Sequence, residues 1–286
     1  MIKKILFLIS FLVLLAAVVL LGYSFYHPGR VGLLDTVRLP IQSRIMSSVG
    51  DVLVSDYYIP IEATSVSPRA LTLAELESHL DILQPGDIFF TDSEKYMSSR
   101  FIPGKWKHSG IYLGTKQQAS ELLGGHTPWS QVLNLHFKTG RERLILDSSA
   151  DGVAIRDFSQ LSNLRSVSML IALSAFRINR PQEDLQVFIS HAFEQLGKPY
   201  DFDLMLDNPE NIYCSELLYQ GLKHIGIDLP LREMVYGREV LTPDNAFHSI
   251  MTEGILSGGF ELVFKIEKES FTAMGSDTIP ELSALP

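Results

Sequence analysis

The only cysteine of the chain, Cys214, stands where a thiol could act as a nucleophile. It follows a polar loop at 207–210 and begins an amphipathic helix expected over about 214–225. Unpaired N–H groups and the dipole at a helix N-terminus favour a thiolate, and they can also stabilise a developing oxyanion. A structural cysteine would more often lie on the apolar face in the middle of a helix. From the position alone, both the catalytic and the structural interpretation stay open.

A thiol nucleophile needs a base that takes its proton and later protonates the leaving group, and histidine is the usual choice. The chain has 8 histidines. His108 differs from the others because it begins a predicted strand, 108–114, and is followed by Ser109 and Gly110. Such small residues let a backbone or a substrate approach closely. We interpret His108 as the candidate base, with an ordinary edge-strand histidine as the alternative.

A third polar group usually orients the imidazole and fixes its tautomer. Asp147 ends the predicted strand 144–147, and neighbouring antiparallel strands could place its carboxylate beside His108. The alternative is an aspartate that only ends a strand or begins a turn. We predict that thiol and imidazole come within hydrogen-bonding distance at the mouth of an open pocket.

The elements that must position these residues follow an α+β order. A capping box at Thr72–Glu75 begins a first helix, and later helices are expected over about 181–197 and 214–225. Alternating or short apolar runs predict strands at 88–90, 108–114, 144–147, 153–155, 166–172 and 261–266. This order differs from an alternating βαβ pattern, and no glycine-rich phosphate loop follows a strand.

Five segments occur in an order known from one family. They are LQPGDIFF (83–90), KHSGIYLG (107–114), GKPYDF (197–202), YCSEL (213–217) and LTPD (241–244). Together they resemble the permuted papain-like cysteine amidases and peptidases of the NlpC type, in particular the YiiX/YebB-like branch. The resemblance covers about residues 71–266, and the single cysteine falls in the expected motif.

The resemblance implies a circularly permuted papain-like fold, with a small antiparallel sheet packed on helices. It implies that Cys214 is the nucleophile and His108 the base. The third polar residue, often Glu in this branch, falls on Asp147, whose side chain is one methylene shorter. Tyr200 and Tyr213 lie in matching motifs and could line the pocket or assist the oxyanion hole. The insert at 117–141 is longer than a tight hairpin and is predicted to be a lid or a substrate-binding loop.

The predicted organisation has five parts: a cytoplasmic tip (1–4), a transmembrane anchor (5–22), a stalk or accessory segment (23–70), the catalytic domain (71–270) and a loose tail (271–286). The anchor is an uncharged apolar run of bilayer length. Lys3 and Lys4 precede it, so the N-terminus is expected in the cytoplasm and the domain outside the inner (cytoplasmic) membrane, as a single-pass protein. A cleaved signal peptide is the alternative, although the run ends without a small-x-small site.

The composition limits the partners. A formal net charge of −9 without a basic cluster argues against nucleic acid as a partner. No HExxH or paired-histidine spacing occurs, so neither a metal nor a cofactor is expected. A membrane association through the anchor is expected instead.

The leading functional hypothesis is a thiol hydrolase. It would cleave an amide or ester bond of a cell-envelope substrate, either a peptidoglycan stem peptide or a lipid or N-acyl amide, through a thioester intermediate. Two alternatives remain: an acyltransferase that acts on lipid or N-acyl substrates, and a catalytically inactive envelope-binding module.

Overall fold

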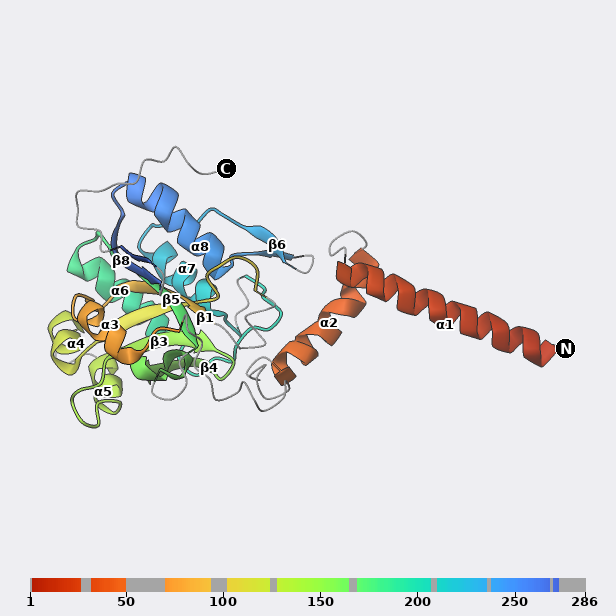
Figure 1. The fold of residues 1–286 in the computed structure, drawn as a ribbon, viewed down its shortest axis with the longest axis horizontal. Coiled ribbons are helices and arrows are strands. Elements are labelled where there is room, and N and C mark those ends of the chain that lie inside the picture. Colours follow the sequence, from red (N-terminus) through yellow and green to blue (C-terminus); the bar gives the residue numbers. More distant parts are fainter. Residues whose placement is uncertain are drawn as a thin grey trace.

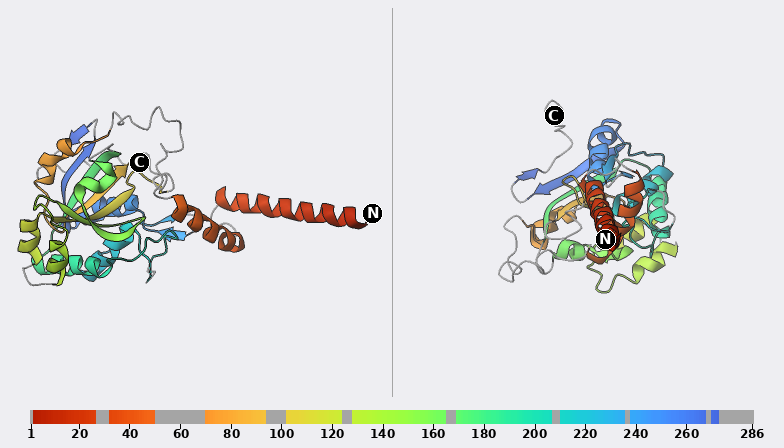
Figure 2. Two further views of the ribbon diagram at one scale, coloured as in Figure 1. Left: turned by 90° about the horizontal axis from the view of Figure 1, so that it is seen from below. Right: turned by 90° about the vertical axis from the view of Figure 1, so that its right-hand side faces the viewer.

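The computed structural model describes residues 2–26, 32–49, 70–93, 102–123, 128–164, 169–206, 210–235, 238–267 and 270–272. Two helices, α1 (Ile2–Tyr26) and α2 (Gly32–Val49), precede a sheet domain and extend away from it (Figures 1 and 2). Among the described residues, none of the helices has both the length and the apolar character that crossing a membrane requires. The transmembrane helix expected over 5–22 is therefore not supported.

A seven-stranded antiparallel sheet forms the centre of the domain, in the order β4-β3-β2-β1-β5-β8-β9. Its strands are β1 (Ile88–Ser93), β2 (His108–Gly114), β3 (Leu144–Ser149), β4 (Gly152–Asp157), β5 (Leu170–Ile178), β8 (Phe260–Glu267) and β9 (Ser270–Thr272). A separate hairpin pairs β6 (Glu233–Val235) with β7 (Arg238–Val240). The sheet is larger than the small one that was expected, but the mixed composition of helices and antiparallel strands is confirmed.

Helices cover both faces of this sheet because its strands alternate apolar side chains between the two faces. Phe89 and Phe90 of β1, for example, belong to different core clusters. One face packs against α3 (Leu73–Leu80) and the 3-10 helix η3 (Phe158–Asn163). The other packs against α4 (Lys116–Leu123), α5 (Pro128–Asn134), α6 (Gln182–Glu194), α7 (Cys214–His224), α8 (Pro243–Ser249) and the π-helical turn η4 (Ile250–Gly254).

The strand expected over 166–172 is the element whose prediction differs most from the structure. Residues 165–168 lie outside the described part, and β5 begins at Leu170 and continues to Ile178. Its extent follows its neighbour β1, since Ser93 pairs with Leu170 and Ile88 pairs with Phe176. Pairing with β1 therefore determines where β5 ends, which the local sequence did not predict.

Two predictions concern segments outside the catalytic core. The accessory segment predicted over 23–70 contains α2, while 50–69 lie outside the described residues. Of the tail predicted over 271–286, residues 271 and 272 belong to β9 and the rest lie outside the described part. The predicted domain boundaries stay predictions.

The insert at 117–141 packs against the core at a distance from His108. Trp129 stacks on Phe193 of α6 with ring centroids 5.0 Å apart, and Gln186 Nε2 donates a hydrogen bond of 2.7 Å to the carbonyl of Leu122. The insert follows the Gly114 end of β2, whereas His108 begins that strand. The role of this insert as a lid or a substrate-binding loop stays a prediction, and residues 124–127 lie outside the described part of the chain.

Candidate active site

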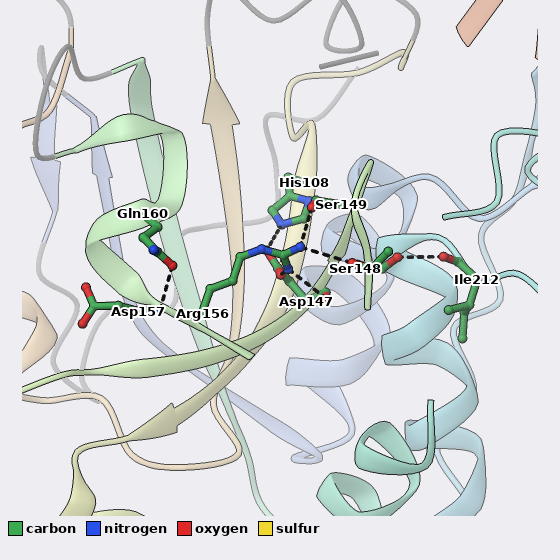
Figure 3. A network of polar contacts seen from close by, with 9 residues as sticks. His108, Asp147, Ser148, Ser149, Arg156, Asp157, Gln160 and Ile212 are labelled. Atoms are coloured by element: carbon green, nitrogen blue, oxygen red, sulfur yellow. Dashed lines mark hydrogen bonds and ion pairs between the residues drawn. The ribbon is translucent and has the colours of Figure 1, made fainter. Parts of the chain in front are cut away.

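The register of β2 and β3 brings His108 and Asp147 together. Gly110 pairs with Asp147, and His108 lies two residues before Gly110, so its side chain is on the same face of the sheet. His108 Nε2 and Asp147 Oδ2 are 2.8 Å apart (Figure 3). This is a short, charge-assisted contact when the imidazole is protonated.

Gly110 makes this arrangement possible. A Cβ atom built on Gly110 would lie 2.5 Å from the Phe89 ring and 3.0 Å from Asp147 Cβ. Any side chain here would displace Phe89 or push Asp147 away from His108. The close approach predicted at Gly110 therefore exists, and the groups that make it are Phe89 and Asp147.

Cys214 is the first residue of α7, as the sequence predicted. Tyr213 precedes the helix in extended conformation (φ −101°, ψ 168°) and gives no side-chain cap. Leu217 N–H donates a hydrogen bond of 3.0 Å to the carbonyl of Tyr213, which is the first i to i+4 bond of the helix. The N–H groups of Cys214 and Ser215 precede this bond and so have no acceptor within the helix. A negative charge on the sulfur or on a substrate oxygen would be favoured at this end.

Hydrogen bonds from buried serines fix the segment that carries Cys214. Ser148 Oγ of β3 donates to the carbonyl of Ile212 at 2.7 Å, and Ser215 Oγ donates to the carbonyl of Leu241 at 2.7 Å. The first bond ties the start of α7 to the strand of Asp147. The two halves of the site are thus held to one another through a buried network.

The LTPD motif positions the chain just before His108. Asp244 Oδ1 accepts hydrogen bonds from the backbone N–H groups of Lys105 (2.8 Å) and Trp106 (3.0 Å). Thr242 caps α8 and so fixes the helix on which Asp244 lies. The motif therefore connects α8 to the approach to β2.

The thiol of Cys214 lies close enough to His108 for the imidazole to shift its pKa. Because Nε2 of His108 faces Asp147, Nδ1 is the ring nitrogen left for the sulfur. Burial alone would raise the pKa of the thiol, but the His108 hydrogen bond and charge outweigh it, so the pKa of Cys214 lies below its ordinary value. A lowered pKa of the thiol beside His108 favours a thiolate and imidazolium pair.

The pKa values of His108 and Asp147 move in the directions that such a pair needs. Burial lowers the pKa of His108, but hydrogen bonds to Asp147 and Cys214 outweigh it and raise the pKa to about 10. Burial raises the pKa of Asp147, and the hydrogen bond to His108 together with the charges of His108 and Arg156 lowers it below the ordinary value. Asp147 is therefore an ionised acceptor for the imidazole.

The thiol is more enclosed than the open pocket that was expected. Cys214 is 2% exposed, whereas the His108 side chain is 20% exposed. Tyr200 is also partly exposed. The site therefore reaches solvent at His108 and Tyr200, while the thiol itself is buried.

The two tyrosines of the matching motifs have different positions. Tyr200 lies near Cys214, and burial followed by the charge of Cys214 raises the pKa of its hydroxyl well above the ordinary value, so it is a neutral group that can donate a hydrogen bond. Tyr213 is 1% exposed and packs with Val240, Leu204 and Leu206. Both rings belong to this apolar cluster, in which Tyr213 is buried and Tyr200 is partly exposed.

Sequence reasoning did not single out Arg156 of β4, which forms an ion pair with Asp147. The available signal was a charged residue directly after the predicted strand 153–155, which neighbours the predicted strand of Asp147. As to metals, no set of three or more His, Cys, Asp or Glu side chains in the described ranges could hold an ion.

Comparison with known proteins shows the family to which this chain belongs. The family model described as permuted papain-like amidase enzyme, YaeF/YiiX, C92 family, matches residues 82–266. The crystal structure of metalloprotein yiiX from Escherichia coli O157:H7 is similar at 15% identity and a TM-score of 0.44, over 64% of this chain and 98% of that one. No curated protein matches the chain. Since the family model spans well over half of its length, this chain belongs to the permuted papain-like amidases and is an enzyme, a hydrolase of the cysteine-peptidase type.

Proposed function

We propose that the protein hydrolyses an amide or ester bond of a cell-envelope substrate with Cys214 as nucleophile, His108 as general base and acid, and Asp147 as the group that orients the imidazole. The main support for this proposal is the pairing of His108 Nε2 with Asp147 Oδ2 at 2.8 Å, together with the lowered pKa of the Cys214 thiol beside the same imidazole. Membership of an amidase family supports an amide as the bond that is cleaved.

The proposed reaction has two steps, formation of a thioester and its hydrolysis. The thiolate of Cys214 adds to the substrate carbonyl, the imidazolium of His108 gives its proton to the leaving amine, and the C–N bond breaks to leave a thioester. Neutral His108 then takes a proton from water as the hydroxyl adds to the thioester carbonyl. The C–S bond breaks, the acid is released, and the thiolate and imidazolium pair forms again.

The start of α7 and Tyr200 are suited to stabilise the charge that develops on the carbonyl oxygen. The N–H groups before the helical ladder of α7 are donors fixed in place, and a neutral Tyr200 hydroxyl can donate once the sulfur is bonded to carbon. Donors arranged in advance around a developing oxyanion lower the barrier by about 3–4 kcal/mol each. Tyr213 packs in the same apolar cluster as Tyr200 and would help to hold that ring in place.

Product analysis tests the proposal and separates its alternatives. The purified protein is incubated with a peptidoglycan stem peptide and, separately, with an N-acyl amino acid or lipid amide, each with and without an added amine, and the products are identified by mass spectrometry. Hydrolysis predicts a free acid and a free amine in both conditions. Acylated amine as the sole product would point to acyl transfer, and intact substrates of both kinds would contradict an envelope amide as the target.

The cell location predicted from the sequence stays a prediction. It rests on the apolar run at 5–22 and on the two lysines before it. A reporter enzyme fused after Pro286 tests it, since activity of the reporter inside the cytoplasm would contradict a catalytic domain outside the membrane.

A further inference from the structure

We propose that Arg156 is a positioning residue that holds the carboxylate of Asp147 in the orientation in which it meets His108. The inference rests on the proposed function, in which Asp147 orients the imidazole. It assigns to β4 a part in the site that neither the sequence motifs nor the family match indicates.

The register of β3 and β4 places Arg156 beside Asp147. Asp147 pairs with Ala154, and Arg156 lies two residues further along β4, on the same face of the sheet. His108, Asp147 and Arg156 therefore lie on one face of three neighbouring strands. Figure 3 shows the guanidinium extending from β4 toward the carboxylate that His108 contacts.

The guanidinium is fixed by several acceptors. Nη1 forms a close ion pair with Asp147 Oδ1 and lies 3.5 Å from the Asp147 carbonyl oxygen. Nη2 donates to Ser149 Oγ at 2.8 Å and to the carbonyl of Gly152 at 3.3 Å. All these acceptors belong to the β3–β4 hairpin, so the planar fork of the guanidinium has a single orientation relative to Asp147.

Each oxygen of the Asp147 carboxylate therefore has its own partner. Oδ2 contacts His108 Nε2, and Oδ1 contacts Arg156. A carboxylate held by the imidazole alone could rotate about its Cβ–Cγ bond, whereas the second contact prevents that rotation. The side chains of Asp147 and Arg156 are 3% and 18% exposed, so water screens their attraction only weakly.

Arg156 also keeps Asp147 ionised throughout the reaction. His108 is a cation only until it gives its proton to the leaving group, after which the buried carboxylate has a neutral neighbour. The guanidinium does not lose its proton at any working pH and stays paired with Asp147 in both states. The carboxylate is then ready to accept the N–H of His108 when the imidazole is protonated again.

The pH dependence of Cys214 labelling by iodoacetamide tests this role without a known substrate. In Arg156→Gln, the Asp147 carboxylate can rotate and stabilises the imidazolium of His108 less. The midpoint of labelling should therefore rise by about one pH unit, which is a roughly tenfold change in the equilibrium between thiol and thiolate. Arg156→Lys keeps the charge but loses the fork, and an intermediate midpoint is expected. Arg143→Gln is the matched control, because Arg143 pairs with Asp81 at 2.5 Å, outside the site, and should leave the midpoint unchanged.

A double variant separates positioning from a general loss of structure. If Arg156 acts through Asp147, Arg156→Gln should cause no further shift once Asp147→Ala is present. An unchanged midpoint in the folded Arg156→Gln variant, or an equal further shift in the Asp147→Ala background, would overturn the inference. If Arg156→Gln does not fold, Arg156→Lys decides by the same criteria. A wild-type midpoint at the ordinary thiol value would instead count against the proposed function itself.

Discussion

Cys214→Ala is expected to lower the hydrolysis rate by at least roughly 10⁴-fold, because the variant has no atom that can form the thioester. The loss concerns the bond-forming step only, so substrate should still bind. The loss is measured as the ratio of initial hydrolysis rates of wild type and variant at equal protein concentration. The substrate is the one identified by product analysis. Turnover near the wild-type rate would show that the thioester pathway is wrong.

Folding of the Cys214 variants must be checked separately, because the side chain is 2% exposed at the start of α7. Cys214→Ser is the matched partner of Cys214→Ala, since it keeps nearly the same volume and replaces only the nucleophilic atom. Both variants should melt within a few degrees of the wild type. A loss of activity accompanied by a much lower Tm would not by itself support a catalytic role, and the folded variant of the two then decides.

His108→Gln is expected to lower kcat/KM by roughly 10²- to 10⁴-fold, the usual contribution of a positioned general acid and base. Glutamine is similar in size and can still donate to Asp147, but it cannot exchange a proton with the thiol or the leaving group. The pKa of Cys214, which His108 lowers in the wild type, should move upward in this variant. Part of the lost rate should therefore return at higher pH.

His248→Gln provides the control for His108→Gln. His248 also lies beside a carboxylate, with its Nε2 3.4 Å from Asp244 Oδ2, but it is 49% exposed and belongs to α8. Removing that imidazole changes the same kind of pair but leaves Asp244 Oδ1 bonded to the N–H groups of Lys105 and Trp106, so kcat/KM should stay near the wild-type value. Equal losses in the two variants would contradict a specific role for His108.

Much of the site could be predicted from sequence because it rests on local signals. A loop followed by an amphipathic helix placed Cys214 at a helix start, and a strand pattern placed His108 at the start of β2. The proximity of Asp147 followed from the expectation that the strands of His108 and Asp147 are antiparallel neighbours. Residue type and periodicity indicated where these residues lie, and the family resemblance indicated their roles.

The remaining features depend on contacts between segments that are distant in sequence. Arg156 is a strand residue like any other until the β3–β4 register sets it diagonally across from Asp147. The sequence of the insert after β2 predicts a loop. In the structure, its Trp129 stacks on Phe193, 64 residues further along the chain (193 minus 129). Such tertiary contacts, including the length over which β5 pairs with β1, cannot be predicted from a local sequence pattern.

The labelling rate of wild-type Cys214 by iodoacetamide, followed against pH, tests the thiolate and imidazolium pair most directly. Since His108 lowers the pKa of the thiol, we expect a labelling midpoint well below the ordinary thiol value of about 8.5. A midpoint at or above about 8.5 would mean that the imidazole does not stabilise the sulfur as an anion, and it would contradict the mechanism proposed for this enzyme.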